Sequence, residues 1–306
     1  MEQEYAIEIK GLTKKYFRKT VLDNVSLEVE KGAIYGIVGK NGAGKTTLIR
    51  LLCNLQSPTL GTYSIFGADR KSKGIKNSRK RMGAMIESPA VYLDMSAKEN
   101  LKQQALILGL PSFDSVNTVL EMVGLGDVGN KKVKHFSLGM KQRLGIAIAL
   151  LGDPDVVILD EPINGLDPYG IIEIRELILK LNREKNTTFV ICSHILSELN
   201  LIATHYCFLD RGKVVRRISA EELSAECKKS TRVTVSNSAA LVRVLDEMGY
   251  DYKLLSEGEA EIYAETDLTS LAVALNGADC KLLSYKEQNE TLESYFINLF
   301  GGEGVV

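Results

Sequence analysis

The sequence of 306 residues has no tryptophan, six prolines and five cysteines. The cysteines, at positions 53, 192, 207, 227 and 280, are scattered, and no two of them form a C-x-x-C pair. Neither a zinc site nor a disulfide framework is therefore indicated. The chain has no run of about 18 apolar residues, and its N-terminus lacks a signal-peptide pattern. We expect a protein of the reducing cytosol that reaches a membrane only through a partner.

An excess of charge of either sign is also missing, because 38 lysines and arginines stand against 39 acidic residues. Such a chain produces no strong net field that would favour nucleic acid as a partner. Hydrophobic residues make up 45% of the sequence, which excludes extensive disorder. The length predicts two domains.

One glycine-rich stretch carries the strongest signal in the sequence. It consists of Gly39, Lys40, Asn41, Gly42, Ala43, Gly44, Lys45 and Thr46, which fits the P-loop or Walker A pattern G-x-x-x-x-G-K-T. The glycines allow consecutive backbone N–H groups to point at phosphate oxygens. Lys45 adds a positive charge for the β- and γ-phosphates, and the Thr46 hydroxyl can bind Mg²⁺.

The residues on both sides of this stretch have the patterns of a strand and a helix, which is the structural context of a P-loop. Residues 33–38 form an apolar run bounded by glycines, as in a buried strand, and residues 47–55 have the apolar pattern of a helix. A chance match to the pattern has odds of roughly one in a hundred from average composition. The strand and helix lower these odds further. We therefore predict that the residues from Gly39 to Thr47 bind the phosphates of a nucleotide.

Polar side chains follow three other apolar strands. They are Asp160 and Glu161 after residues 156–159, His194 after residues 189–193, and Glu87 after residues 82–86. Open α/β sheets place their chemistry at the carboxyl ends of strands. We predict that Asp160 reaches the Mg²⁺ ion and that Glu161 orients or deprotonates the water that attacks the γ-phosphate. His194 is expected to contact the γ-phosphate, and a purely structural histidine is the alternative.

The order of the elements predicts the fold. Strands and helices alternate over residues 1–220, which indicates an α/β domain with a mixed, largely parallel sheet and helices on both faces. A helix-rich block at about residues 88–150 indicates an inserted helical subdomain. After a linker at 221–227, residues 228–306 follow the order β-α-β-β-α-β. This order predicts a small α+β domain of the ferredoxin-like type.

Two features allow more than one interpretation. The ring of Tyr16 could stack on a purine base or could simply pack against the protein. A short basic stretch contains Lys71, Lys73, Lys76, Arg79, Lys80 and Arg81. Such a run is usually a solvated face, and a docking surface is the more specific alternative.

Taken in order, these motifs resemble those of the nucleotide-binding subunit of an ABC transporter. The resemblance covers roughly residues 5–220. Walker A is matched by Gly39 to Thr46, and Walker B with its catalytic glutamate by Ile158 to Glu161. The family signature, usually L-S-G-G-Q, is matched after Phe136 by Ser137, Leu138, Gly139 and Met140, the D-loop by Asn164 to Asp167, and the switch histidine by His194. Tyr16 falls where the family keeps an aromatic residue that stacks on adenine.

The sequence departs from the family pattern at two places. Leu138 and Met140 replace a glycine and the final glutamine of the signature, whereas Ser137 and Gly139 remain. Glu87 stands where the family has a glutamine that offers an oxygen to Mg²⁺ or to the attacking water. These departures resemble the ATPases of bacitracin-resistance and lantibiotic-immunity exporters, which also carry C-terminal extensions.

The resemblance implies an ATPase that uses ATP and Mg²⁺ and acts as a dimer, with a homodimer expected. Ser137 and Gly139 would act in trans, at the P-loop of the partner cassette. Opening and closing of the dimer would drive a separate membrane permease, which would hold the subunit on the inner face of the cell membrane. The family contacts its permease through the helical subdomain near Glu87 and the basic stretch.

Two other functions belong to different classes. The first is a soluble ABC ATPase that acts on nucleic acid or the ribosome, and the single cassette without coiled-coil heptads argues against it. The second is a regulatory module that binds ATP without hydrolysis, and the intact Asp160, Glu161 and His194 argue against it. We expect no nucleic-acid partner.

Overall fold

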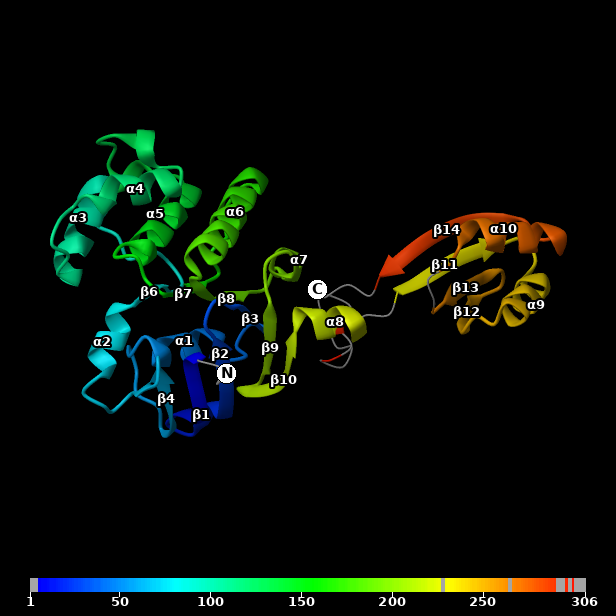
Figure 1. The fold of residues 1–306 in the computed structure, drawn as a ribbon, viewed down its shortest axis with the longest axis horizontal. Helices are drawn as coiled ribbons and strands as arrows, with labels where there is room; N and C mark the ends of the chain where they lie inside the picture. Colours follow the sequence, from blue (N-terminus) through cyan, green and yellow to red (C-terminus); the bar gives the residue numbers. More distant parts are fainter. Residues whose placement is uncertain (1–4, 227–228, 264–265, 290–294, 297–298, 300–306) are drawn as a thin grey trace. The chain divides into compact units, whose positions relative to one another are not determined.

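The computed structural model describes residues 5–226, 229–263, 266–289, 295–296 and 299. The chain forms two compact units, Met1–Ala220 and Glu221–Val306 (Figure 1). The change of unit coincides with the change of sequence pattern near residue 220. Helix α8 (Ala220–Glu226) occupies most of the stretch that was expected to be a linker.

The first unit is built around a six-stranded sheet with the order β10-β9-β3-β8-β7-β6. Its strands are β3 (Ile34–Val38), β6 (Met82–Met85), β7 (Val156–Asp160), β8 (Thr188–Ser193), β9 (His205–Asp210) and β10 (Lys213–Ser219). All neighbours are parallel except β9 and β10. Every residue of β3, β7 and β8 is buried, which explains their continuous apolar sequences. Because these strands are parallel neighbours, the residues that follow them meet at one edge of the sheet.

A second sheet in this unit is antiparallel and has the order β2-β1-β4-β5. Its strands are β1 (Tyr5–Tyr16), β2 (Lys19–Glu30), β4 (Leu60–Ile65) and β5 (Ala68–Asp69). The alternating segments at 5–9 and 25–29 are thus parts of one long hairpin. Apolar residues of both sheets pack around α1 (Lys45–Leu52) in a common core. The parallel arrangement expected for the domain therefore holds in the larger sheet only.

The expected helical subdomain contains α3 (Ala97–Leu108), α4 (Ser115–Met122) and α5 (Leu138–Leu150). These helices lie together at the top left of Figure 1. Two short 3-10 helices, Gly126–Val128 and Val133–His135, connect α4 to α5. The remaining helices of the unit are α2 (Ile75–Lys80), α6 (Pro168–Lys185) and α7 (Leu196–Asn200).

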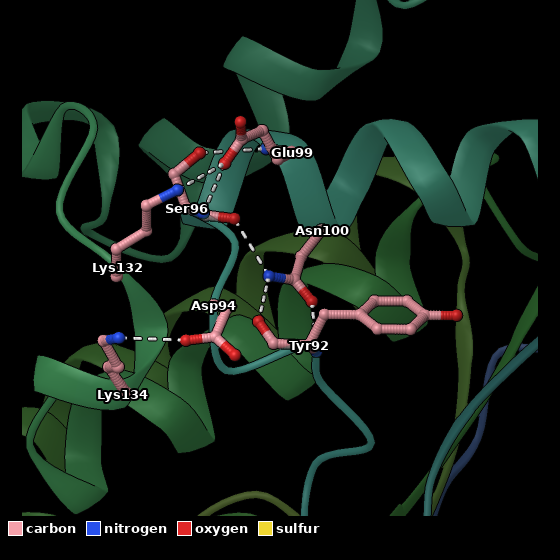
Figure 2. A network of polar contacts seen from close by, with 7 residues as sticks. All are labelled: Tyr92, Asp94, Ser96, Glu99, Asn100, Lys132 and Lys134. Carbon is pink, nitrogen blue, oxygen red and sulfur yellow. Dashed lines mark hydrogen bonds and ion pairs between the residues drawn. The ribbon is translucent and has the colours of Figure 1, made fainter.

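The start of α3 is fixed by a capping box and a buried amide (Figure 2). The Ser96 hydroxyl accepts from the Glu99 N–H at 3.2 Å, and the Glu99 carboxylate accepts from the Ser96 N–H at 2.7 Å. The amide of Asn100, which is 3% exposed, donates to the carbonyls of Tyr92 and Ser96. Asp94 and Lys134 form an ion pair beside this network. These bonds hold the loop before α3 against the helix.

The basic stretch divides into structural and exposed residues. Arg79 donates to the Tyr63 hydroxyl at 2.8 Å, and Arg81 pairs with Asp155 at 2.7 Å. The guanidinium of Arg81 also lies 3.9 Å from the centre of the Phe66 ring. Lys71, Lys73, Lys76 and Lys80 are exposed, as is Arg81 despite its contacts, whereas Arg79 is half-buried. The two arginines therefore contact other segments of the domain, and the four lysines face solvent.

The second unit has the element order that the sequence predicts. It contains β11 (Lys229–Val235), α9 (Ser238–Met248), β12 (Tyr252–Ser256), β13 (Glu259–Ile262), α10 (Leu268–Gly277) and β14 (Leu282–Asn289). The sheet has the order β12-β13-β11-β14 and is antiparallel throughout. This is the strand order of a split β-α-β fold. The last expected helix, 291–300, falls mainly outside the described residues. Among the described residues, no helix combines the length and the apolarity needed to cross a membrane.

Helix α5 approaches strand β6 closely because of a glycine. A Cβ atom at position 83 would lie 1.7 Å from the carbonyl oxygen of Ala149 on α5. An alanine in place of Gly83 can be accommodated only if α5 moves away from β6. The strand leads to Glu87 and the helix carries the signature, so this contact sets the distance between the two segments.

We therefore predict that Gly83→Ala destabilises the first unit by about 1–3 kcal/mol, as overpacking does. The midpoint of thermal unfolding, followed by circular dichroism, should fall by several degrees. Gly74→Ala is the control, because φ at Gly74 is −70° and a Cβ atom there would find its nearest neighbours at 3.8 Å. Equal midpoints for the two variants would contradict the close packing.

Candidate nucleotide-binding site

The P-loop connects β3 to α1 and has the backbone geometry that its glycines permit. Gly42 and Gly44 have φ of 80° and 111°, in the region that side chains disfavour. A Cβ atom at Gly44 would also lie 2.7 Å from a methyl group of Leu22. Helix α1 begins directly after this loop and has no acidic residue in its first turn. The free N–H groups and the positive end of the helix dipole are therefore available to an anion.

A cavity of about 610 Å³ opens in front of the P-loop, within the size range of ligand pockets. It is lined by Lys19, Thr20, Val21, Lys40, Asn41, Gly42, Ala43, Gly44, Lys45, Thr46, Thr47, Glu87, Asp160, Glu161 and Arg211. The structure thus brings most of the predicted P-loop together with the three predicted carboxylates. Of the predicted P-loop residues, Gly39 is not part of the lining.

Lys45 lies at the base of the cavity. Its side chain is largely buried, and its ammonium group donates to the carbonyl of Gly39 at 2.6 Å. A Cβ atom at position 39 would approach the carbonyl oxygen of Leu209 within 2.4 Å, so a glycine is required there. Gly39 therefore contributes to the site by holding the lysine across the loop.

Asp160 is a buried carboxylate at the end of β7. It is 1% exposed and accepts a hydrogen bond from the Thr46 hydroxyl at 2.9 Å. Burial raises the pKa of Asp160, and the Glu161 and Glu87 carboxylates raise it further, whereas the Thr46 hydrogen bond and the Lys45 charge lower it. A cation at this position would stabilise the ionised carboxylate.

The oxygens of Thr46 and Asp160 are of the type that Mg²⁺ prefers. Within the described part of the chain, no three histidine, cysteine, aspartate or glutamate side chains gather as a metal site of their own. A Mg²⁺ ion at this place would therefore take most of its ligands from phosphate and water. This is how Mg²⁺ usually binds together with a nucleotide, so these residues fit the ion.

Glu161 and His194 form a pair at the edge of the cavity. Glu161 follows β7 with φ of 52°, and its N–H donates to the carbonyl of Cys192 at 2.8 Å. Its carboxylate lies 2.7 Å from Nδ1 of His194 and accepts from the His194 N–H at 3.3 Å. The two predicted catalytic residues are thus in direct contact. The histidine side chain is about half exposed and does not line the cavity.

Glu87 has a partner that the sequence analysis did not identify. It follows β6 with φ of 57°, and its carboxylate pairs with Arg50 at 2.9 Å. Arg50 lies one turn after Thr46 on α1, so the two residues share one face of the helix. This spacing is the signal that could have identified Arg50. The ion pair connects the loop of Glu87 to the P-loop helix.

The wall of the cavity beside the P-loop comes from two turns that the sequence analysis did not include. Lys19, Thr20 and Val21 begin β2, directly after the turn that follows Tyr16, and Arg211 precedes Gly212 in the turn between β9 and β10. A Cβ atom at Gly212 would lie 2.2 Å from the carbonyl oxygen of Val21, which brings the two turns together.

Tyr16 stands near this wall without lining the cavity. Its hydroxyl donates to Gln56, and Nζ of Lys14 lies 4.9 Å from the centre of its ring. The side chain is 37% exposed. Stacking on adenine remains a prediction for this residue.

The signature residues are separate from the cavity. Ser137 caps α5 by accepting from the Met140 N–H at 3.2 Å, and neither residue, nor Leu138 or Gly139, lines the cavity. Ser137 is exposed, and Leu138 is 63% exposed although it is apolar. A Cβ atom at Gly139 would lie 3.2 Å from Leu166 in the D-loop. The signature therefore packs against the D-loop of its own chain and presents its outer side to solvent.

Asp167 ends the D-loop and begins α6. Its carboxylate accepts from the Gly170 N–H at 2.8 Å and so caps the helix. The predicted site residues thus form two groups. One group surrounds the cavity, and the other consists of the signature and the D-loop.

Comparison with known proteins agrees with this geometry. The family model described as ABC transporter matches residues 22–164. The bacitracin transport ATP-binding protein BcrA of Enterococcus faecalis is 39% identical over an alignment that covers 100% of this chain and 99% of the relative. The lantibiotic transport ATP-binding protein SrtF of Streptococcus pyogenes is 42% identical and covers 68% of this chain and 89% of the relative.

A solved structure of an ATP-binding cassette is also similar to this chain. The ATP-binding cassette MJ0796, in a dimeric post-hydrolysis state bound to ADP and Pi, has a TM-score of 0.65 at 25% identity. This match covers 70% of the present chain and 98% of the cassette. The P-loop, the carboxylates at the end of β7 and the signature at the start of α5 lie within residues 22–164, which the family model matches. The chain belongs to the ABC transporter family as an ATP-binding subunit.

Proposed function

We propose that this chain is the ATP-hydrolysing subunit of an exporter and works as a pair of cassettes around two ATP molecules. The observation that supports this most strongly is the separation of the two groups of site residues. One cavity combines the P-loop with Asp160 and Glu161, while the signature faces solvent elsewhere on the same unit. A complete site then requires the signature of a second chain.

The site residues have distinct parts in ATP hydrolysis. The P-loop amides and Lys45 bind the phosphates, and Tyr16 stacks on the adenine. Thr46 and Asp160 hold Mg²⁺, which neutralises charge on the phosphates when it is bound. Glu161 orients a water in line with the γ-phosphate and takes its proton, so that the water oxygen attacks phosphorus and ADP leaves. His194 keeps the Glu161 carboxylate in place through the contact at 2.7 Å.

The signature of the second chain completes the site from the other side. Ser137 and Gly139 of one cassette contact the γ-phosphate held by the other, and the exposed Leu138 becomes covered. The γ-phosphate then joins the two chains, and its removal by hydrolysis releases them. This opening and closing moves a separate membrane permease.

The relatives suggest the cargo. BcrA and SrtF are named for transport of bacitracin and of a lantibiotic, which are peptide antibiotics. We propose export of a peptide of this class, with the subunit held at the inner face of the membrane by its permease. A function on nucleic acid or the ribosome is not favoured, because these relatives are transport proteins. A module without hydrolysis is not favoured either, because Asp160, Glu161 and His194 are all in place.

The role of Glu161 gives the first test. Glu161→Gln keeps the size of the side chain and removes the base, so the rate of ATP hydrolysis should fall at least about 100-fold. ATP affinity should stay within about twofold, and ATP with Mg²⁺ should trap a dimer that is visible in size-exclusion chromatography. Glu184→Gln, an exposed site on α6 away from the cavity, is the matched control. If Glu161→Gln hydrolyses ATP at the parental rate, Glu161 is not the base.

The ion pair between Glu87 and Arg50 gives the second test. Both side chains are more than one-third exposed, so solvent weakens the effect of each charge. Glu87→Gln removes a negative charge from the cavity and should raise the Mg²⁺ concentration for half-maximal ATPase activity by about two- to fivefold. Arg50→Met leaves the carboxylate without its partner and should lower this concentration. If both variants keep the parental Mg²⁺ requirement, Glu87 has no part in binding the Mg²⁺–ATP complex.

A further inference from the structure

Gln142 is a buried polar residue outside the cavity, and its contact leads directly to the catalytic carboxylate. It lies on α5, on the same helix as the signature, and is 4% exposed. Its side-chain amide donates to the backbone carbonyl of Glu161 at 2.8 Å. A buried amide could have been satisfied by any nearby carbonyl. Here it holds the residue that carries the proposed base.

The backbone of Glu161 needs such support. Its φ of 52° is a left-handed conformation that a glutamate keeps only when its surroundings fix it. The N–H is held by the carbonyl of Cys192, and the carbonyl accepts from Gln142 and from the N–H of Asn164. The direction of the carboxylate depends on this conformation. Gln142 is therefore placed to determine where the base points.

Helix α5 also contacts the loop of Glu87, another carboxylate that lines the cavity. A Cβ atom at Gly145 would lie 2.6 Å from the sulfur of Met85 and 2.7 Å from the ring of Pro89, on either side of Glu87. One helix thus begins with the signature at Ser137, holds Glu161 through Gln142, and packs against the segment of Glu87. If the helix moves as a rigid element, a displacement of its first turn would reach both carboxylates.

We propose that Gln142 is a positioning residue that couples the signature of a chain to Glu161 of the same chain. When Ser137 contacts the γ-phosphate in the partner's ATP site, α5 moves or becomes more rigid. Gln142 then aligns Glu161 in the ATP site of the chain to which both residues belong. The two ATP sites of the dimer are linked in this way within each chain. This inference rests on the proposed function, since it assumes that the signature acts in trans and that Glu161 is the base.

The kinetics of Gln142→Met test the proposal on the full chain. The variant keeps the length and burial of the side chain and removes the donor. We expect kcat for ATP hydrolysis to fall at least about tenfold, because a misplaced base loses its alignment. The KM for ATP should change less than about twofold, since Gln142 does not line the cavity. Gln142→Leu, which also lacks a donor, should behave in the same way and serves if the first variant does not fold.

Asn100→Leu is the matched control. Asn100 is also buried, and its amide also donates to backbone carbonyls, but these lie in the loop before α3 (Figure 2). This variant should lower the unfolding midpoint and keep the parental kcat below that midpoint. Parental kcat in Gln142→Met, or a raised KM with unchanged kcat, would overturn the proposal. If the parental chain itself does not hydrolyse ATP, the proposed function fails instead, so the two failures are distinct.

Discussion

The hydrogen bond between Thr46 and Asp160 is the interaction on which the site depends. It joins the start of α1 to the end of β7 across 114 positions of sequence. A carboxylate buried to this degree is unfavourable unless charges and donors compensate it. Thr46 and Lys45 supply part of this compensation, and a cation bound with phosphate would supply the rest. The parallel sheet makes the arrangement possible, because β8 alone separates β3 from β7 and the ends of all three strands lie together.

The unit that contains this cavity also contains the signature, which is the other half of an ATP site. Ser137 and Leu138 are exposed at the start of α5, and a Cβ atom at Gly165 of the D-loop would lie 2.3 Å from the Leu138 side chain. An exposed apolar residue beside a polar cap fits a surface that a partner covers. Both halves are connected inside the chain by α5, which reaches Glu161 through Gln142. Helix α5 therefore connects the signature, which acts in the partner's ATP site, to Glu161, which acts in the chain's own ATP site.

The sequence predicts the P-loop, the strand ends and the helical subdomain well, because their signals are local. Glycine spacing and apolar runs identify β3, β7 and β8, and parallel pairing then brings Asp160, Glu161 and the residues of the P-loop together. The cavity wall at Lys19 to Val21 and at Arg211 comes from two turns that are far apart in sequence, and no local pattern marks it. The positive φ angles of Glu87 and Glu161 could not be predicted, since glutamate does not favour them. The contacts of Arg50 and Gln142 also arise only when distant elements pack.

The dependence of the ATPase rate on protein concentration tests most directly whether a working site needs two chains. The rate per chain would be measured at saturating ATP and Mg²⁺ over about a thousandfold range of concentration. A shared site predicts a rate per chain that rises in proportion to concentration while monomers dominate and then levels off as dimers form. A rate per chain that stays constant down to concentrations at which only monomers are present would contradict the account.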